Sequence, residues 1–206
     1  MTSTLTVTPA TLLPWNAIER VLSSTAESRH CWCRWWLTTN AEYSTLTDEQ
    51  RHNQAERAHA TDEPRGLIAL LDAEPVGWVS VAPRSDYLRL PRTRLVSDGT
   101  PDTDFTDPSI WAIVCFTVAP AHRRSGVARE LLAEAIAYAT AGGARRIEAY
   151  PIDTDALAAT TGPASAGDLN TGTLALFVSA GFLEVSRPKA ARPIVQLVTT
   201  TTDHEA

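Results

Sequence analysis

The chain has 206 residues, of which 44% are apolar and six are tryptophan. This length and composition predict one folded, soluble domain with a sizeable core and argue against disorder. The formal net charge of −6 at pH 7 argues against a nucleic-acid partner, because proteins that bind phosphate backbones carry basic surfaces.

The N-terminal part predicts a strand followed by helices. Residues 5–7 suit a short strand, and Pro14 stands at a first helical position with apolar residues at helical spacing behind it. An aromatic segment, 30–37, comes next. Residues 47–50 have the form of a capping box, so the polar stretch 50–60 is predicted to be a mostly solvated helix.

The next part predicts an antiparallel hairpin. Residues 66–71 and 76–81 are apolar, and the turn-like sequence 72–75 separates them. Residues 83–108 are rich in Pro, Arg, Asp and Thr and are predicted to be mostly loop.

A strand, a basic turn and a long helix follow. Residues 110–118 are almost continuously apolar, as in a central strand covered on both faces. The basic, glycine-bearing stretch 121–126 precedes a helix that Gly142 and Gly143 end. Its predicted buried stripe is made of Val127, Leu131, Leu132, Ala135, Ile136 and Ala139.

The C-terminal part predicts a strand over 146–150, a long low-complexity loop over 151–168 and a short helix over 171–180. The loop is either a lid or a simple insertion. Two strands, 182–185 and 194–198, close the chain.

The start of the long helix predicts an anion site. A helix N-terminus presents unpaired N–H groups and the positive end of the helix dipole. Gly126 lets the backbone approach an anion closely, and Arg123 and Arg124 add positive charge. These residues favour a phosphate ligand but leave several nucleotide classes open. The turn has neither the Walker spacing nor the dinucleotide fingerprint.

Residues 118–128 resemble the acetyl-CoA signature of the GCN5-related N-acetyltransferases, with Arg123, Gly126 and Ala128 at its core positions. The resemblance implies acetyl-CoA as co-substrate and no metal. It implies that main-chain groups of Phe116 and Val118 bind the pantetheine arm. It also implies that the pyrophosphate is bound by the backbone amides of Arg124, Ser125, Gly126, Val127 and Ala128.

A second motif downstream is similar to the family's cofactor-contacting helix. Asn170 matches its Asn, which contacts the cofactor, and Gly181-Phe182 matches its end. Phe177 stands where the family often has a Tyr that protonates the departing thiolate, so the usual general acid is missing.

The resemblance implies an α/β fold: a central, mostly antiparallel sheet with one parallel pair splayed at the cofactor, flanked by helices. We expect residues 1–206 to form a single domain with a cofactor core over 109–185. Residues 1–65 and the loop 151–168 are expected to form the acceptor side. Residues 148–151 and 31–33 also look like features of an actinobacterial-type branch of the family.

Acetylation of an amine requires a neutral nitrogen, so a base or a water relay must take a proton. Glu148 and Asp153 follow the long helix and are the candidate bases, and Tyr150 could replace the missing acid. Glu148 could equally be a structural strand residue. Direct attack in a ternary complex is the expected mechanism, with proximity supplying much of the rate.

The cysteines and tryptophans have structural as well as functional interpretations. Cys31 and Cys33 lack a second ligand pair for zinc, so they and Cys115 are predicted to be small core residues. Three cysteines do not make a disulfide framework. Four tryptophans could line an acceptor pocket or fill the core, namely Trp32, Trp35, Trp36 and Trp111.

Several alternatives stay open at this stage. The same fold could serve as a non-catalytic acyl-CoA sensor, which Phe177 favours, or as a toxin that acetylates charged tRNA, which the acidic balance disfavours. A partner-binding protein without a ligand is disfavoured by the phosphate turn. The acceptor is expected to be a small-molecule amine or a protein amino group, and a homodimer is one assembly open to it. Without a signal peptide or a membrane-spanning run, we expect a cytoplasmic location and no membrane partner.

Overall fold

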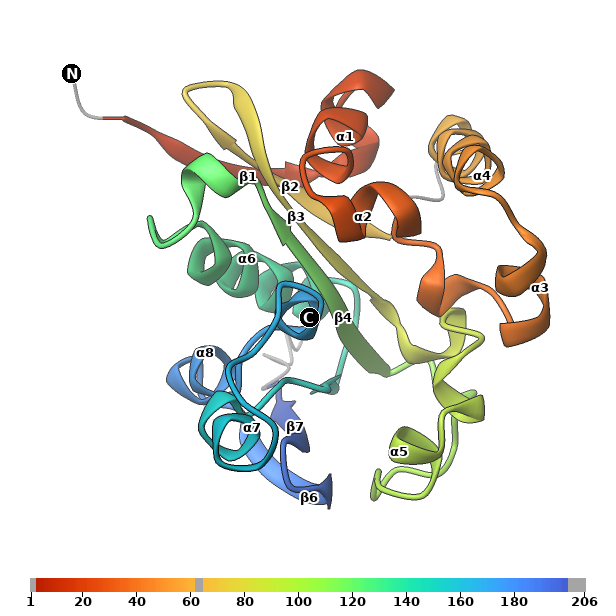
Figure 1. The fold of residues 1–206 in the computed structure, drawn as a ribbon, viewed down its shortest axis with the longest axis vertical. Helices are drawn as coiled ribbons and strands as arrows, with labels where there is room; N and C mark the ends of the chain where they lie inside the picture. The colour runs from red at the N-terminus through yellow and green to blue at the C-terminus, as the bar shows by residue number, and fades with distance from the viewer. Residues whose placement is uncertain (1–2, 62–64, 200–206) are drawn as a thin grey trace, which may run out of the picture.

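The computed structural model describes residues 3–61 and 65–199 (Figure 1). They form one seven-stranded sheet of order β1-β2-β3-β4-β5-β7-β6, in which only β4 and β5 run parallel. The strands are β1 (Leu5–Pro9), β2 (Gly66–Leu71), β3 (Glu74–Pro83), β4 (Ile110–Val118), β5 (Arg146–Ala149), β6 (Leu183–Lys189) and β7 (Arg192–Val198). The predicted mixed α/β fold with a mostly antiparallel sheet is therefore confirmed.

Helices cover both faces of the sheet (Figure 1). The α-helices are α1 (Trp15–Leu22), α2 (Ala26–Cys31), α3 (Asn40–Thr45), α4 (Asp48–Ala60), α5 (Arg94–Ser97), α6 (Val127–Ala141), α7 (Thr154–Thr160) and α8 (Leu174–Ser179). The 3-10 helices are η1 (Ala10–Leu12), η2 (Trp35–Leu37), η3 (Arg84–Asp86), η4 (Leu90–Arg92), η5 (Pro120–His122) and η6 (Asp168–Thr171). None of the described helices is long and apolar enough to cross a bilayer.

The main core lies between the sheet and the long helix α6. Five of the six residues of the predicted stripe are buried, and Ile136 packs at the edge of the same cluster. Gly77 on β3 faces the start of this helix, and a Cβ there would lie 2.7 Å from a methyl of Val127. The glycine thus lets the N-terminus of α6 approach the sheet closely.

The opposite face carries two smaller clusters. Helix α1 packs on β2 and β3 through Ile18, Val21 and Leu22. The capping box of α4 is present as predicted, with Thr47 and Gln50 each bonding the other's backbone. The second cluster lies under α5 and includes Tyr87, Val114 and Tyr150.

The prediction that 151–168 is only loop is wrong, because it contains α7. The Asp153 carboxylate caps this helix by accepting the backbone N–H of Ala156 at 3.0 Å, and an alanine-rich run with good helix propensity follows. The first closing strand also extends beyond its predicted end, to Lys189, because it pairs along β7.

Candidate functional site

Strands β4 and β5 separate half-way along β4. Their parallel pairing comprises four residue pairs and ends at Ile113 and Ala149, whereas β4 continues to Val118. Beyond β5 the chain turns away, and Ile152 pairs with Thr173 instead. The β5-facing backbone of β4 beyond Ile113 therefore lies beside a gap in the sheet.

A β-bulge in β4 determines which side chains face this gap. Cys115 pairs with Ser80 and Ile113 with Val81, so Val114 is the extra residue. Val114 and Cys115 both pack in the cluster under α5, and Phe116 returns to the α6 face.

The turn after β4 leaves the N-terminus of α6 open. Gly126 precedes the helix with φ 91°, a left-handed conformation that suits glycine. Among the described residues, no side chain caps this end. The Ser125 hydroxyl instead donates to the carbonyl of His122 at 2.6 Å and closes the turn. The first N–H groups of α6 thus remain available to an anion.

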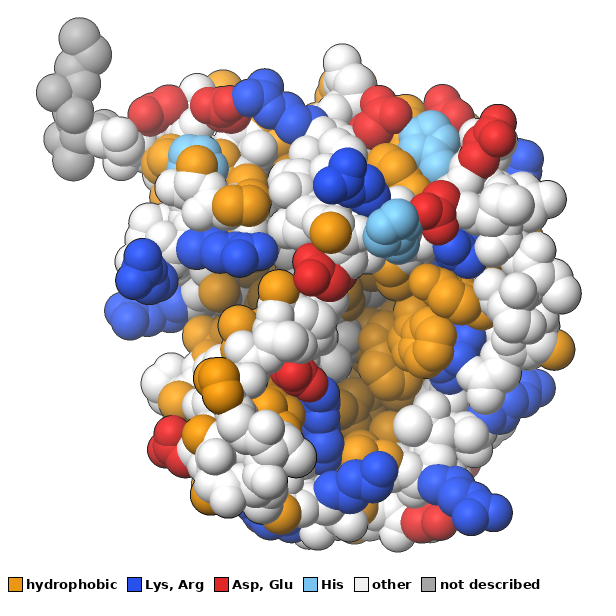
Figure 2. Space-filling model, in the orientation of Figure 1, with side chains coloured by type: hydrophobic (Ala, Val, Ile, Leu, Met, Phe, Trp, Pro, Cys, Tyr) orange, Lys and Arg blue, Asp and Glu red, His pale blue; other side chains and the backbone are white. Residues whose placement is uncertain are grey.

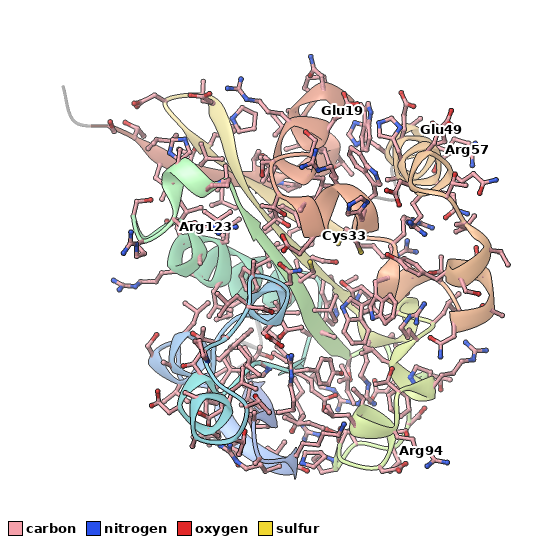
Figure 3. All side chains as sticks on the ribbon, viewed as in Figure 1. Glu19, Cys33, Glu49, Arg57, Arg94 and Arg123 are labelled. Carbon is pink, nitrogen blue, oxygen red and sulfur yellow. The ribbon has the colours of Figure 1, made fainter. Side chains whose placement is uncertain are left out.

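The gap and the open helix end meet in one pocket of about 480 Å³. Eight of the nine predicted cofactor residues line it, and the ninth, Ser125, lies between two of them. The eight are Phe116, Val118, Arg123, Arg124, Gly126, Val127, Ala128 and Asn170. Figure 3 labels Arg123 on the α6 side of β4 and Cys33 on the other side.

Other lining residues were not predicted from the sequence. Arg129 follows the open helix end, where it is exposed and lines the pocket. Thr25 and Ala166 come from segments expected on the acceptor side, and Leu169 follows directly after the second of these segments. Thr25 is also the N-cap of α2, which a Thr before a polar helical run can indicate.

Phe177 is completely buried behind this pocket. Its ring meets those of Phe116 and Phe182 edge-on, with centroids 6.0 and 5.1 Å away. The position that often carries an acid in the family pattern is thus filled by an aromatic packing contact.

Glu148 and Tyr150 lie together on the face of the sheet opposite α6. The Tyr150 hydroxyl donates to Glu148 Oε1 at 2.6 Å, and Thr100 and Gln196 donate to Oε2 at 2.5 and 2.7 Å. Arg84 pairs with the same carboxylate at 3.4 Å, and both side chains are fully buried. Burial and the neighbouring Glu148 charge raise the pKa of Tyr150 well above its usual value, so it remains a neutral phenol at physiological pH.

Asp153 lies apart from this pair. One of its oxygens caps α7, and the other accepts from Arg187 at 2.8 Å. The backbone N–H of Ala156 and then the Arg187 side chain hold the pKa of Asp153 below its ordinary value.

The match to a sequence family covers residues 27–160, which is more than half of the chain, and the family is the acetyltransferase (GNAT) family. The chain belongs to the GNAT acetyltransferase family. No curated protein was found to match it.

Solved N-acetyltransferase structures share this fold. An N-acetyltransferase from Kribbella flavida has 16% identity and a TM-score of 0.53, with 95% of this chain and 98% of that chain covered. The PaiA N-acetyltransferase from Thermoplasma acidophilum, in complex with coenzyme A, has 12% identity and a TM-score of 0.51, with 97% and 100% covered. Ribosomal-protein-alanine N-acetyltransferase from Brucella melitensis has 18% identity and a TM-score of 0.51, with 95% and 99% covered.

This GNAT distributes its candidate acceptor tryptophans over different parts of the molecule. Trp111 packs under α6, and Trp32 packs near Trp15 in the cluster of α1. Of the four candidate tryptophans, only Trp35 and Trp36 lie beside the segment that contains η3 and η4. The ring of Trp36 lies 6.3 Å from that of Tyr150, between centroids.

The cysteines of this GNAT are half-buried and free, with no disulfide among the described residues. The Trp78 indole N–H donates to Cys33 Sγ at 3.2 Å. A hydrogen bond with the Cys115 thiol lowers the pKa of Cys33. Cys33 and Cys115 pack at the edges of the clusters of α1 and α5, which agrees with a packing role for these two.

Proposed function

We propose that the chain transfers an acetyl group from acetyl-CoA to an amine of a small molecule or a protein. The observation that carries this proposal is the single pocket formed where β4 leaves β5 and α6 begins. It combines free strand backbone, suited to an amide-bearing arm, with an uncapped helix N-terminus beside two arginines, suited to a pyrophosphate.

Each lining group has a role in this proposal. The backbone amides of residues 124–128 bind the pyrophosphate, and Arg123 adds charge on the same turn. Main-chain groups of Phe116 and Val118 bind the pantetheine arm across the gap. Asn170 closes the pocket from the other half of the sheet. All of these except Ser125 line the pocket directly, which supports the assignment.

The proposed reaction is direct attack in a ternary complex. The neutral amine attacks the thioester carbon, the C–S bond breaks, and the CoA thiolate leaves. Phe177 has no proton to give, so water protonates the thiolate. The amine proton leaves through water or through Tyr150 and Glu148, which already share a hydrogen bond. Asp153 is the weaker candidate because it lies apart from Tyr150, where it caps α7 and pairs with Arg187.

The domain and branch assignments belong to the same proposal. We take residues 1–206 as one GNAT domain with its cofactor core over 109–185. We place 1–65 and 151–168 on the acceptor side, from which Thr25 and Ala166 reach the cofactor pocket. The actinobacterial-type branch rests on residues 31–33 and 148–151 alone.

A second candidate is a non-catalytic sensor of acyl-CoA. Buried Phe177 favours it, since this residue leaves the pocket without the usual acid.

The test measures binding and turnover separately. A ligand that binds only the folded state at about 100 times its Kd stabilises it by about 2.7 kcal/mol, which for this chain length raises Tm by roughly 5–10 °C. Release of the CoA thiol is then followed with a panel of amines, and products are identified by mass. An acetylated amine supports the transferase. Binding without turnover of any amine supports the sensor, and no shift with acetyl-CoA refutes both.

A further inference from the structure

The face opposite α6 has a hollow floored by hydrophobic side chains. Figure 2 shows it right of centre, and in Figure 1 the same place lies in front of β4, between α3, α5 and α7. The hydrophobic cluster under α5 lies in this region, with Val114 and Tyr150 buried in it. Its partly buried members are Trp36, Leu37, Leu95, Phe105 and Cys115.

This hollow adjoins the point where an acetyl group would be transferred. Cys115 packs in the hollow's cluster, whereas the next residues on β4, Phe116 to Val118, line the cofactor pocket. A ligand in the hollow therefore approaches the same part of β4 from the opposite face. Tyr150, immediately after β5, is buried in the same cluster, and its hydroxyl donates to Glu148.

The segment that carries Trp35 and Trp36 is held in place before any ligand binds. The Arg89 guanidinium stacks on Trp35 at 3.7 Å from the ring centroid, and its Nε donates to the Trp35 carbonyl at 2.5 Å. The Arg89 backbone N–H donates to the Trp36 carbonyl at 3.2 Å. These bonds tie η2 to the segment before η4, so little ordering is needed when a ligand binds.

Several charged groups near the hollow are already bonded within the protein. Glu148 is paired with Arg84, whose Cζ lies 4.3 Å from the centroid of the Phe105 ring. Arg94 on α5 is exposed and points away from the molecule (Figure 3). Other carboxylates of the surrounding segments accept bonds from protein side chains: Asp102 from Gln196, Asp104 from Thr106, Asp153 from Arg187 and Asp168 from Arg192. The carboxylates engaged in this way are less available to a polycation.

We propose that the hollow binds the apolar body of the acceptor, so that the preferred substrate is a hydrophobic monoamine, such as an arylalkylamine, rather than a polycation. This inference rests on the proposed acetyl transfer. Aromatic walls bind an apolar body by burial and ring contact. An apolar surrounding also disfavours the charged ammonium form, which favours the neutral amine that must attack.

The test compares 2-phenylethylamine with spermidine and kanamycin at saturating acetyl-CoA. The variant is Trp36→Ala, and Trp15→Ala is the control, since Trp15 is also half-buried but packs against Trp32 elsewhere. We expect kcat/KM to be at least about tenfold higher for phenylethylamine than for either polycation. Trp36→Ala should raise its KM about tenfold and leave the KM for acetyl-CoA unchanged, while Trp15→Ala changes neither.

Other outcomes separate this inference from the proposed function. Preference for spermidine or kanamycin, or an equal effect of Trp36→Ala on all amines, overturns the inference and leaves the transferase standing. If acetyl-CoA raises Tm but no amine is acetylated, the transferase fails. Calorimetry of phenylethylamine with the CoA-loaded protein then decides: binding weakened by Trp36→Ala supports the hollow as its site, and absence of binding overturns it.

Discussion

Gly126→Glu is the sharpest perturbation of the proposed cofactor site. A Cβ at Gly126 would meet nothing within 4 Å, so the new side chain enters open space in the pocket. Gly143, just beyond the other end of α6, provides a matched control. Its φ is 89°, a Cβ there also meets nothing within 4 Å, and it does not line the pocket.

Both variants lose stability through backbone strain, but only Gly126→Glu should also weaken ligand binding. Each places a non-glycine residue in the left-handed region, which costs about 1–2 kcal/mol and lowers Tm by roughly 2–8 °C. Only the carboxylate at Gly126 faces a bound pyrophosphate. Two like unit charges 4 Å apart repel by about 4 kcal/mol near a protein surface, which weakens binding about a thousandfold.

The assay is thermal unfolding with increasing acetyl-CoA. At 100 times the wild-type Kd, we expect wild type and Gly143→Glu each to gain about 2.7 kcal/mol, and Gly126→Glu to gain less than about 0.1 kcal/mol. An undiminished shift in Gly126→Glu would place the cofactor elsewhere. Equal loss in both variants would mean that strain in α6, rather than charge in the pocket, controls binding.

Three further substitutions test other parts of the structure. Glu148→Ala leaves the fully buried Arg84 without its carboxylate, so the free energy of unfolding in urea should fall by about 3–5 kcal/mol. Phe177→Tyr buries a hydroxyl among aromatic rings; we expect a loss of about 1–3 kcal/mol and no rise in kcat, measured by urea unfolding and CoA release. Asp153→Ala removes the cap of α7 and should cost about 1 kcal/mol at pH 6. The Ala156 N–H lowers the pKa of Asp153 in the folded state. The stability difference between wild type and Asp153→Ala is therefore full above the unfolded pKa near 4 and shrinks as pH falls through the lower folded pKa. Unfolding curves from pH 6 to 2 will measure this change.

Each of these has an outcome that contradicts its reasoning. Glu148→Gln keeps the shape and an acceptor oxygen but removes the charge that pairs with Arg84, so its loss should approach that of Glu148→Ala. A much smaller loss would mean that packing or hydrogen bonding, rather than charge, matters there. A higher kcat in Phe177→Tyr would show that this position reaches the leaving thiol. A stability difference for Asp153→Ala that stays constant to pH 2 would exclude its charge as the cause.

The sequence predicted the strand, turn and helix beside the pocket well because their signals are local. These signals lie within about thirty consecutive residues: the apolar run of β4, Gly126 and the apolar stripe of α6. Each of them determines the backbone conformation of its own segment. The surroundings of Glu148 were not predictable in this way. Its partners Arg84 and Thr100 lie 64 and 48 positions away, in a segment whose composition indicates only loop. Helix α7 was missed because its alanines and threonines were interpreted as low complexity, although Asp153 is a capping residue type.

The short pairing between β4 and β5 has a consequence for how the protein opens. Four residue pairs join the half-sheet β1–β4 to the half-sheet of β5, β7 and β6. We therefore expect the C-terminal half-sheet to detach in hydrogen exchange at a lower free energy than global unfolding. The pocket has walls on both halves, Val118 and Gly126 on one and Asn170 and Thr173 on the other. A ligand that contacts both walls would stabilise the two half-sheets together, so that they would unfold as one cooperative unit instead of two.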